Sequence, residues 1–477
     1  MQKVRRALAM AISIGVSSAA LAAPGTGFVA GAAKVDITPD PALLLPGDSI
    51  RDHLFVRAIM VSNGSSCAVL VGSDIGGLRG ETAEAAIKRG AAIAGCAPEN
   101  FVISATHTHS GSTRSIMDPT GEPGPKHVED AIVAAVTEAH KSLRPARVGY
   151  GTVTLDLNVN RDLMVDGKWL QGPNPAGPSD KTLAILEFID SAGAPIAAYA
   201  NYAMHPINFY LSGVISADVP GEATGYVERQ FGKNMVAVFA QGASGDQNPA
   251  LTRPLYNLVG QRTAAPGLGD MRAAQPAPWI EIGKERNGND RLTAALARPV
   301  PEDRKAAYVN AIQGTGELVR AEGIVMGEKI VDAMRFGIVD LADNGTIVAA
   351  VDTFQCPGRD RLDGAAPVRE GNLPPYADGA PVVIRQGMLR IGDVHIATVN
   401  GEVYSEIATQ LKQRAPKMRL MITTLANGMA NSGYIYSNNA NDHLTFQVIG
   451  SRLKPGCAEA KIVATGLDQL RRVSAAK

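Results

Sequence analysis

The chain has 477 residues, of which 45% are hydrophobic and 19% are charged, and its formal net charge is +0. This balance provides enough apolar side chains for a large buried core and excludes an intrinsically disordered chain. Because no long basic run is present, a nucleic-acid-binding protein is excluded as well.

The first residues have the pattern of a secretory signal peptide. Basic residues between positions 3 and 6 precede an uncharged run over residues 7–23, and Ala20-Leu21-Ala22 supplies a small-residue cleavage site. A membrane anchor is the alternative, but the run is short and rich in Ala and Ser, whereas a spanning helix needs about 20 strongly apolar residues. We expect a signal peptide over residues 1–22 and a periplasmic or secreted mature chain over residues 23–477. No stable membrane span is expected, and transient membrane contact is left open.

Short β-branched runs alternate with Ala-rich helical stretches along the rest of the chain. This alternation predicts an α/β fold in which layered mixed sheets are flanked by helices in a single large domain. The predicted strands are Phe55–Ser62, Ala68–Ser73, Phe101–Ala105, Arg147–Leu157, Leu183–Ile189, Ile196–Tyr202, Met235–Ala240, Pro381–Leu389, His395–Val399 and Arg419–Leu425, with a strand or hairpin at Ile338–Asp352. The predicted helices are Glu81–Gly95, Lys126–Leu143, Gly221–Phe231, Glu302–Met334 and Val403–Arg414.

Two stretches break this pattern. Residues 251–301 lack periodicity and are too long for an ordinary connection, so we interpret them as a functional loop or lid. Residues 364–380 form a second stretch rich in Pro and Gly.

The four cysteines are Cys67, Cys96, Cys356 and Cys457, and none forms the C-x-x-C spacing of a zinc knuckle or redox motif. An oxidising compartment permits disulfides, and four cysteines allow three connectivities. Neighbouring strands would bring Cys67 and Cys96 together. Four buried free thiols are the alternative.

Histidines and a glutamate follow three of the predicted strands. His107 and His109 come directly after one strand, His205 after another, and Glu402 after a third. Ligand sites in α/β folds gather at the carboxyl ends of strands, and a His₂Glu set with one open position is typical of catalytic zinc. The alternatives are a capped turn at His205-Pro206 and a glutamate that merely favours a helix dipole.

Several short motifs occur in the order found in the neutral/alkaline ceramidases, and the chain resembles the catalytic domain of that family over roughly residues 30–460. The motifs are Val35-Asp36-Ile37-Thr38-Pro39, Thr106-His107-Thr108-His109-Ser110-Gly111, Asn160-Arg161, His205-Pro206, Gly245-Asp246 with Asn248-Pro249, Asn400-Gly401-Glu402 and Gly433-Tyr434.

The resemblance implies a zinc amidase with one zinc ion per chain. The implied ligands are His107, His205, Glu402 and Tyr434. The resemblance also places His109 beside the metal, where it stabilises charge or moves protons, and makes Arg161 an active-site residue. The implied reaction is attack of a zinc-bound water on the carbonyl of an N-acyl amide, ceramide or a related lipid.

The chain departs from the family pattern around the substrate. Asn248 stands where the family has its active-site serine, and Phe446 where it has a second tyrosine. We expect Asn248 to act as a catalytic hydrogen-bond donor, and Gln247 and Phe446 to contact the substrate. The smaller C-terminal β domain of typical family members has no counterpart in the printed sequence.

Two other functions remain open. One is a zinc hydrolase of a different amide or of an ester, which a short polar pocket would favour over a long apolar groove. The other is a non-catalytic lipid- or glycan-binding relative, which would have no need of four zinc ligands.

Overall fold

The computed structural model describes residues 27–44, 48–111, 123–210, 212–232, 234–251, 300, 302–363 and 370–476. The predicted signal peptide and nearly all of the predicted loop over residues 251–301 lie outside these residues. The boundary predicted after residue 22 therefore stays a prediction.

A large mixed sheet forms the centre of the fold. Its strands lie in the order β12-β10-β9-β6-β1-β3-β4-β5, with β14 beside β6. The bounds are β1 Val29–Asp36, β3 Phe55–Ser62, β4 Cys67–Ser73, β5 Phe101–Ala105, β6 Arg144–Thr154, β9 Thr182–Asp190, β10 Pro195–Tyr202, β12 Val236–Gln241 and β14 Leu341–Ala342. The pairs β4–β5 and β10–β12 are parallel, so the carboxyl ends of β5 and β10 can each present a loop at the edge of the sheet.

A second sheet has the order β15-β16-β17-β19 and packs against the large one. Its strands are β15 Ile347–Arg361, β16 Tyr376–Ile391, β17 Val394–Val399 and β19 Arg419–Thr423. Alternate residues of the two sheets form the shared core, in which Leu70, Tyr199 and Ile396 are fully buried. The opposite faces of both sheets are apolar too, which requires helices on both outer sides.

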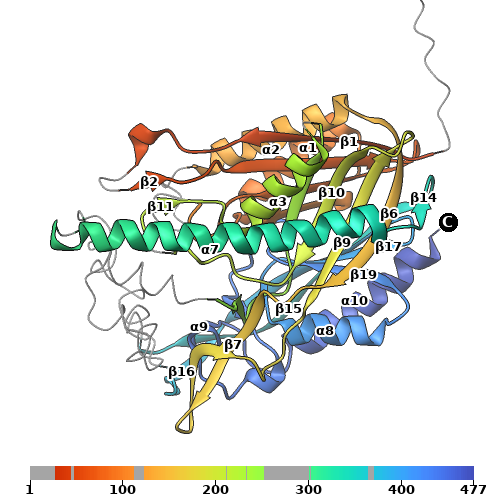
Figure 1. The fold of residues 1–477 in the computed structure, drawn as a ribbon. Helices are drawn as coiled ribbons and strands as arrows, with labels where there is room; N and C mark the ends of the chain where they lie inside the picture. Colours follow the sequence, from red (N-terminus) through yellow and green to blue (C-terminus); the bar gives the residue numbers. More distant parts are fainter. Residues whose placement is uncertain are drawn as a thin grey trace, which may run out of the picture.

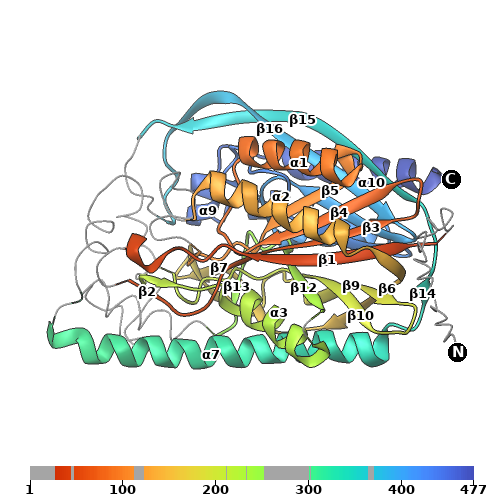
Figure 2. The ribbon, with the colours of Figure 1, turned by 90° about the horizontal axis from the view of Figure 1, so that it is seen from above.

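Helices supply these two outer layers (Figures 1 and 2). Helices α1 (Gly80–Ala94) and α2 (Pro125–Lys141) cover β3 and β4, while α3 (Asp218–Phe231) and α7 (Lys305–Asp332) cover β10 and β12. On the second sheet, α8 (Ser405–Arg414) and α10 (Ala458–Ala475) form the outer layer. The fold therefore has four layers in the order helices, sheet, sheet, helices.

Short elements complete the fold near the ends of the central strands. They are the sheet β13-β7-β8 (Gln247–Pro249, Asn158–Val165 and Lys168–Asn174), the pair β11-β2 (Val214–Ile215 and Ser49–Ile50), the pair β18-β20 (Glu402–Val403 and Tyr434–Ile435) and helix α9 (Phe446–Gly450).

The predicted fold class is confirmed: the chain is a mixed α/β protein with several sheets flanked by helices. The longer elements that were missed are β1, the β7–β8 hairpin and α10. Residues 376–380 were also wrongly included in an irregular stretch, because they form the start of β16. Pairing with β15 along nearly the whole of β16 overrides the weak strand propensity of Asp378 and Gly379.

Both pairs of cysteines form disulfides, Cys67 with Cys96 and Cys356 with Cys457. The first pair links β4 to the end of α1, and the second links β15 to the start of α10. The alternative of four free thiols is therefore wrong for this structure.

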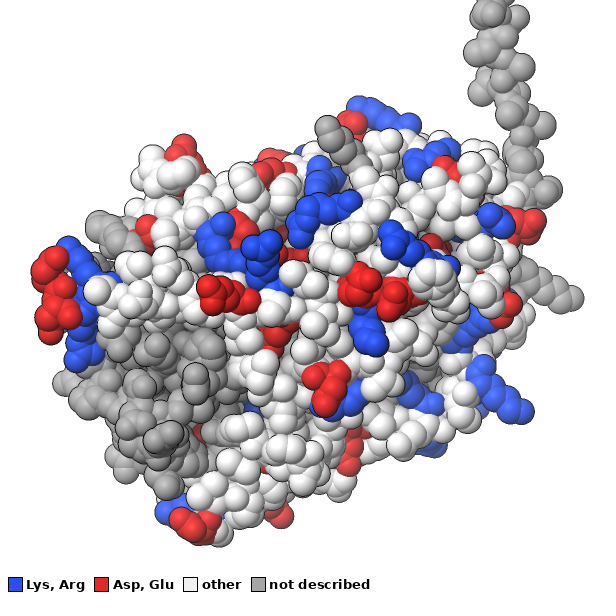
Figure 3. All heavy atoms as spheres, viewed as in Figure 1, with Lys and Arg blue, Asp and Glu red and all other residues white. Residues whose placement is uncertain are grey.

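Within the described residues no helix is long and apolar enough to cross a membrane. On the face seen in Figure 3, acidic and basic side chains are interspersed.

Candidate active site

His107 lies where the chain leaves β5, and its conformation is set by a neighbouring loop. Its φ of 67° lies in the left-handed region that non-glycine residues rarely adopt. The backbone N–H donates to the carbonyl of Ile75 at 3.0 Å, and the ring Nδ1 contacts the carbonyl of Gly76. A carbonyl can only accept, so Nδ1 carries the proton and the lone pair is on Nε2.

His205 is held in the same manner at the end of β10. Both its backbone N–H and its ring Nδ1 face the carbonyl of Gln247, at 3.0 and 3.1 Å. Its Nε2 is therefore also a free lone pair. Burial, with the charge of Arg161 adding to it, lowers the pKa of His205 to about 3, so the ring is neutral at physiological pH.

Glu402 and Tyr434 are adjacent because the short strands β18 and β20 pair in parallel, with Glu402 opposite Tyr434. Burial opposes ionisation of Glu402, but the close approach of the two histidine rings to its Oε2 holds its pKa well below the usual value. The carboxylate is thus ionised where it faces the two rings.

The predicted ligand atoms converge on one point. The Nε2 atoms of His107 and His205 are 3.2 Å apart, and each lies 3.2–3.3 Å from Oε2 of Glu402. Nε2 of His109 is 3.3 Å from that of His107, and His107, His109 and His205 place their ligand atoms within 4.8 Å of one another. The ring of Tyr434 is centred 6.4 Å from that of His205.

Convergent lone pairs are the signature of a cation site. Two lone pairs and a carboxylate oxygen repel one another unless a proton or a metal ion lies between them. Imidazole and carboxylate are both common zinc ligands, and backbone carbonyls that orient the second ring nitrogen are the usual outer shell of such sites. The residues therefore fit a zinc ion, and their assignment as ligands stays a prediction.

Arg161 lies beside this cluster and is buried. It donates from Nη1 to Oδ1 of Asn248 at 3.1 Å and from Nη2 to the carbonyl of Gly245 at 2.6 Å. Its guanidinium carbon lies 5.2 Å from the ring centre of Tyr434 and 5.4 Å from that of Phe446, within the range of a cation–π contact. The structure thus brings three predicted site residues into contact with the guanidinium of Arg161, namely Asn248, Tyr434 and Phe446.

Gln247 meets the cluster through its backbone. Its side-chain nitrogen donates to the carbonyl of Pro178 and the hydroxyl of Ser405, and its side-chain oxygen accepts from Ser179 at 2.6 Å. These hydrogen bonds occupy the side-chain amide of Gln247 with protein partners, while its backbone carbonyl orients His205. The geometry gives Gln247 a positioning contact, in place of the substrate contact that we expected.

Two residues without a predicted role help to build the site. The carboxylate of Asp246 accepts from the backbone N–H of Ser405 at 2.7 Å and from Asn160 at 3.0 Å, and so ties β7 to the start of α8. Burial raises the pKa of Asp246 to about 7. The ring of Tyr210 packs edge-on against His109, with centres 5.2 Å apart. The Gly245-Asp246 motif pointed to Asp246, whereas nothing in the sequence pointed to Tyr210.

A buried acid pair lies behind the loop that carries His205. Asp218 accepts from the backbone and side-chain nitrogens of Asn208 at 2.8 and 2.9 Å. Glu322 of α7 is 2% exposed, and within the described part of the chain neither of its oxygens has a hydrogen-bond partner of good geometry. Burial first, and the charge of Asp218 second, raise the pKa of Glu322 to about 8.

Comparison with known proteins agrees with the motifs. Residues 45–264 match the family model "Neutral/alkaline non-lysosomal ceramidase, N-terminal". The chain is 31% identical over 178 residues to neutral ceramidase B of Dictyostelium discoideum, an alignment that covers 32% of this chain and 24% of that protein. The matched region is thus about a quarter of the curated relative's length.

The fold is also similar to solved ceramidase structures. The neutral ceramidase of Pseudomonas aeruginosa superposes with a TM-score of 0.65 and 18% identity, covering 94% of this chain and 75% of that one. A structure described as ceramidase complexed with C2 gives a TM-score of 0.64 and 18% identity, covering 94% and 76%. The resemblance to the neutral/alkaline ceramidases is confirmed by the family model in sequence and by these structures in fold.

Proposed function

From this likeness to the neutral/alkaline ceramidases, we propose that the chain is a zinc-dependent hydrolase of an N-acyl amide, ceramide or a related N-acyl lipid. The observation that carries the proposal is the convergence of Nε2 of His107, Nε2 of His205 and Oε2 of Glu402 within 3.2–3.3 Å. Neutral imidazoles and one ionised carboxylate form a donor set of the type that catalytic zinc uses.

The metal would be held by His107, His205 and Glu402, with Tyr434 as the fourth ligand. A zinc ion there supplies Lewis acidity, which polarises a carbonyl and makes water acidic enough to react near neutral pH. His109 stands at the edge of this set and is less buried than the other two histidines, so it is placed to take up or deliver a proton.

Arg161 and Asn248 form the donor side of the site. Oδ1 of Asn248 accepts from Arg161, so the hydrogen-bonding group that remains on this side chain is its NH₂ donor. An amide cannot attack a carbonyl as a serine can, and no acyl-enzyme is expected at this position. The NH₂ group and the guanidinium are suited to bind a carbonyl oxygen that gains negative charge during the reaction.

A second enzyme function retains the metal and changes the substrate. The replacement of serine by Asn248 and of tyrosine by Phe446 alters groups beside Arg161 while the proposed ligands are kept. This pattern favours an altered amide, or an ester, as the second candidate. A non-catalytic lipid-binding relative is the weaker alternative, because binding alone does not require the convergent lone pairs.

The decisive experiment combines metal analysis with a substrate screen. We expect purified protein to contain about one zinc ion per chain and to hydrolyse at least one member of a panel of ceramides, N-acyl amino acids and simple esters. Glu402→Gln, which keeps the shape of the side chain, is the matched inactive control. Protein that is fully active without metal, or that binds zinc and hydrolyses none of the panel, would contradict the proposal.

We also propose that the protein is exported and that its single catalytic domain starts after residue 22. N-terminal sequencing of protein from the periplasm or medium should find Ala23 first. Recovery of an intact Met1 in the membrane fraction would favour the anchor.

A further inference from the structure

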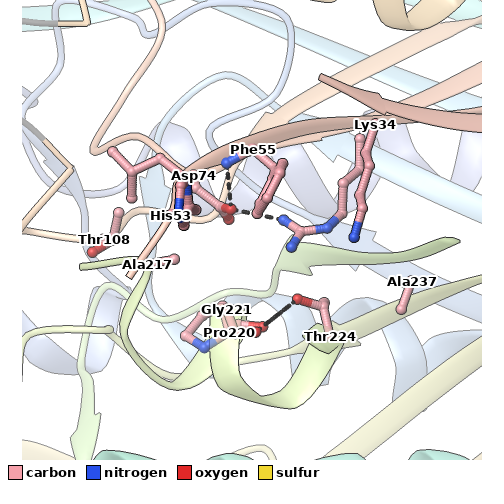
Figure 4. A network of polar contacts seen from close by, with 12 residues as sticks. Lys34, His53, Phe55, Asp74, Thr108, Ala217, Pro220, Gly221, Thr224 and Ala237 are labelled. Atoms are coloured by element: carbon pink, nitrogen blue, oxygen red, sulfur yellow. Dashed lines mark hydrogen bonds and ion pairs between the residues drawn. The ribbon is translucent and has the colours of Figure 1, made fainter. Parts of the chain in front are cut away.

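Arg57 on β3 is a buried cation that joins two buried carboxylates. It is 4% exposed, donates from Nη1 to Oδ2 of Asp74 at 2.7 Å, and donates from Nε to Oε1 of Glu228 at 3.3 Å. Lys34 binds the other oxygen of Glu228. Figure 4 shows Lys34, Phe55 and Asp74 above α3, with the dashed bonds of Asp74.

Asp74 begins the loop that orients His107. Its Oδ2 also accepts the backbone N–H of Phe55 at 2.9 Å, and its own N–H donates to the carbonyl of Phe55 at 2.9 Å. The next two residues, Ile75 and Gly76, supply the carbonyls that accept the backbone N–H and the ring Nδ1 of His107. The first of these carbonyls therefore belongs to the residue next to Asp74, and only Ile75 separates Asp74 from the second.

The loop formed by residues 74–76 is packed so closely that a small displacement of Asp74 would also displace the carbonyls that hold His107. A Cβ atom on Gly111 would lie 2.9 Å from the carbonyl oxygen of Asp74 and 3.1 Å from Cα of Ile75. His107 is held at a positive φ that an isolated chain would avoid. Such a conformation persists only where the surroundings enforce it, and the surroundings here are the loop that Asp74 anchors.

We propose that Arg57 is a positioning residue: by holding Asp74, it fixes the Gly76 carbonyl and thereby the Nδ1–H form of His107 that points Nε2 into the ligand cluster. The proposal rests on the proposed function only where metal binding is the readout. The orientation of His107 is a property of the metal-free chain and can be measured on its own.

The position of Arg57 offers an unusual test. Arg57 lines a cavity of about 530 Å³ whose opposite wall is α3, where Gly221, Gly225 and Gly232 carry no side chain. Removing the guanidinium by Arg57→Ala would leave a vacancy that opens onto this cavity, between the carboxylates of Asp74 and Glu228. A methylguanidinium ion from solution can reach that vacancy and replace the missing charge and donors.

The experiment uses the full chain labelled with ¹⁵N-histidine, with and without zinc. In the metal-free parent, the His107 ring should give the signal of one form, protonated at Nδ1. Arg57→Ala should mix the two ring forms and raise the Kd for zinc about 10- to 100-fold, the usual effect of losing an outer-shell partner. Millimolar methylguanidinium should restore the single ring form of His107 and the zinc Kd of the parent. Methylurea, which has a similar shape and no charge, should restore neither the ring form nor the Kd.

Two further variants separate positioning from general stability. Lys34→Ala removes the other cation on Glu228 without touching Asp74, so the His107 signal and the zinc Kd should match the parent. Arg57→Lys keeps a charge that reaches one carboxylate and should give an intermediate Kd. An unchanged His107 ring signal in folded Arg57→Ala protein would overturn the proposal, and so would a zinc Kd that shifts equally in Lys34→Ala. A parent that binds no zinc would contradict the proposed function alone, because the ring signal would still report on Arg57.

Discussion

Ionisation of Glu322 should lower the free energy of unfolding as the pH rises, and Glu322→Gln should remove that contribution. The carboxyl is 2% exposed and lies near the negative charge of Asp218, and these surroundings raise its pKa from the ordinary 4.5 to about 8. A raised carboxyl pKa means that the folded protein keeps a proton that the unfolded chain releases. The free energy of unfolding is therefore unaffected below about pH 4.5, decreases between pH 4.5 and 8, and levels off above.

The size of this effect follows from the shift. Each pKa unit corresponds to about 1.4 kcal/mol, so the ionisation of Glu322 should cost the folded state about 3 kcal/mol between pH 5 and pH 8. Glutamine has nearly the same shape and does not ionise. The substitution should therefore leave stability at pH 5 little changed and raise it at pH 8 by about that amount.

Urea unfolding of the parent and of Glu322→Gln at pH 5, 6, 7 and 8 measures the difference directly. Glu317→Gln is the matched control, because Glu317 is an exposed residue of the same helix, and it should follow the parent at every pH. If the curves for Glu322→Gln and the parent stay parallel from pH 5 to pH 8, Glu322 is ionised at no cost and the reasoning is refuted.

Three other predictions concern the site and the disulfides. His107→Ala, His205→Ala and Glu402→Ala should each lose most bound zinc by elemental analysis, whereas Tyr434→Phe should lose less because both imidazoles and the carboxylate remain. Full zinc occupancy in all four variants would refute the ligand set. Asn248→Ala should lower kcat about 100-fold or more with zinc retained, as loss of an oxyanion donor does, and an unchanged kcat or a trapped acyl-enzyme in mass spectra would contradict this role. Replacing both Cys356 and Cys457 by Ala opens a loop with a sequence separation of 101 and should lower the free energy of unfolding by about 4–5 kcal/mol, whereas an unchanged urea midpoint would show that the bond contributes nothing.

Strands β3 and β5 were predictable because they are almost wholly buried, whereas the half-exposed β1 between β6 and β3 was missed. Phe55–Ser62 and Phe101–Ala105 are mostly apolar or β-branched, and their predicted bounds equal those of β3 and β5. The β7–β8 hairpin was missed because Asn160, Arg161 and Asp162 break the alternation in β7, although Asp166-Gly167, both at positive φ, is the kind of two-residue turn that marks a hairpin. Its pairing depends on partners far along the chain, such as Gln247 opposite Asn160.

The site was predictable in its side chains and unpredictable in its supports. Strand ends and family motifs pointed to His107, His205 and Glu402, which the structure brings together. The carbonyls of Gly76 and Gln247, which fix the two rings, belong to the backbone and leave no mark in residue type. The same holds for the role of Arg57, since a sequence does not show which carboxylates a buried cation will meet.

The pairing of β18 with β20 limits how this part of the protein can change in length. Only two residues of each strand pair, and Tyr434 faces Glu402 in a single register. A one-residue slip would turn Tyr434 to the opposite side of its strand. Gly433 has a φ of 63°, and a Cβ atom added to it would lie 2.9 Å from the carbonyl oxygen of Gly450, so there is no room for adjustment directly before Tyr434. Insertions and deletions between Val403 and Tyr434 must therefore be absorbed before Gly433, and we expect relatives that vary in length here to keep the glycine–tyrosine step intact.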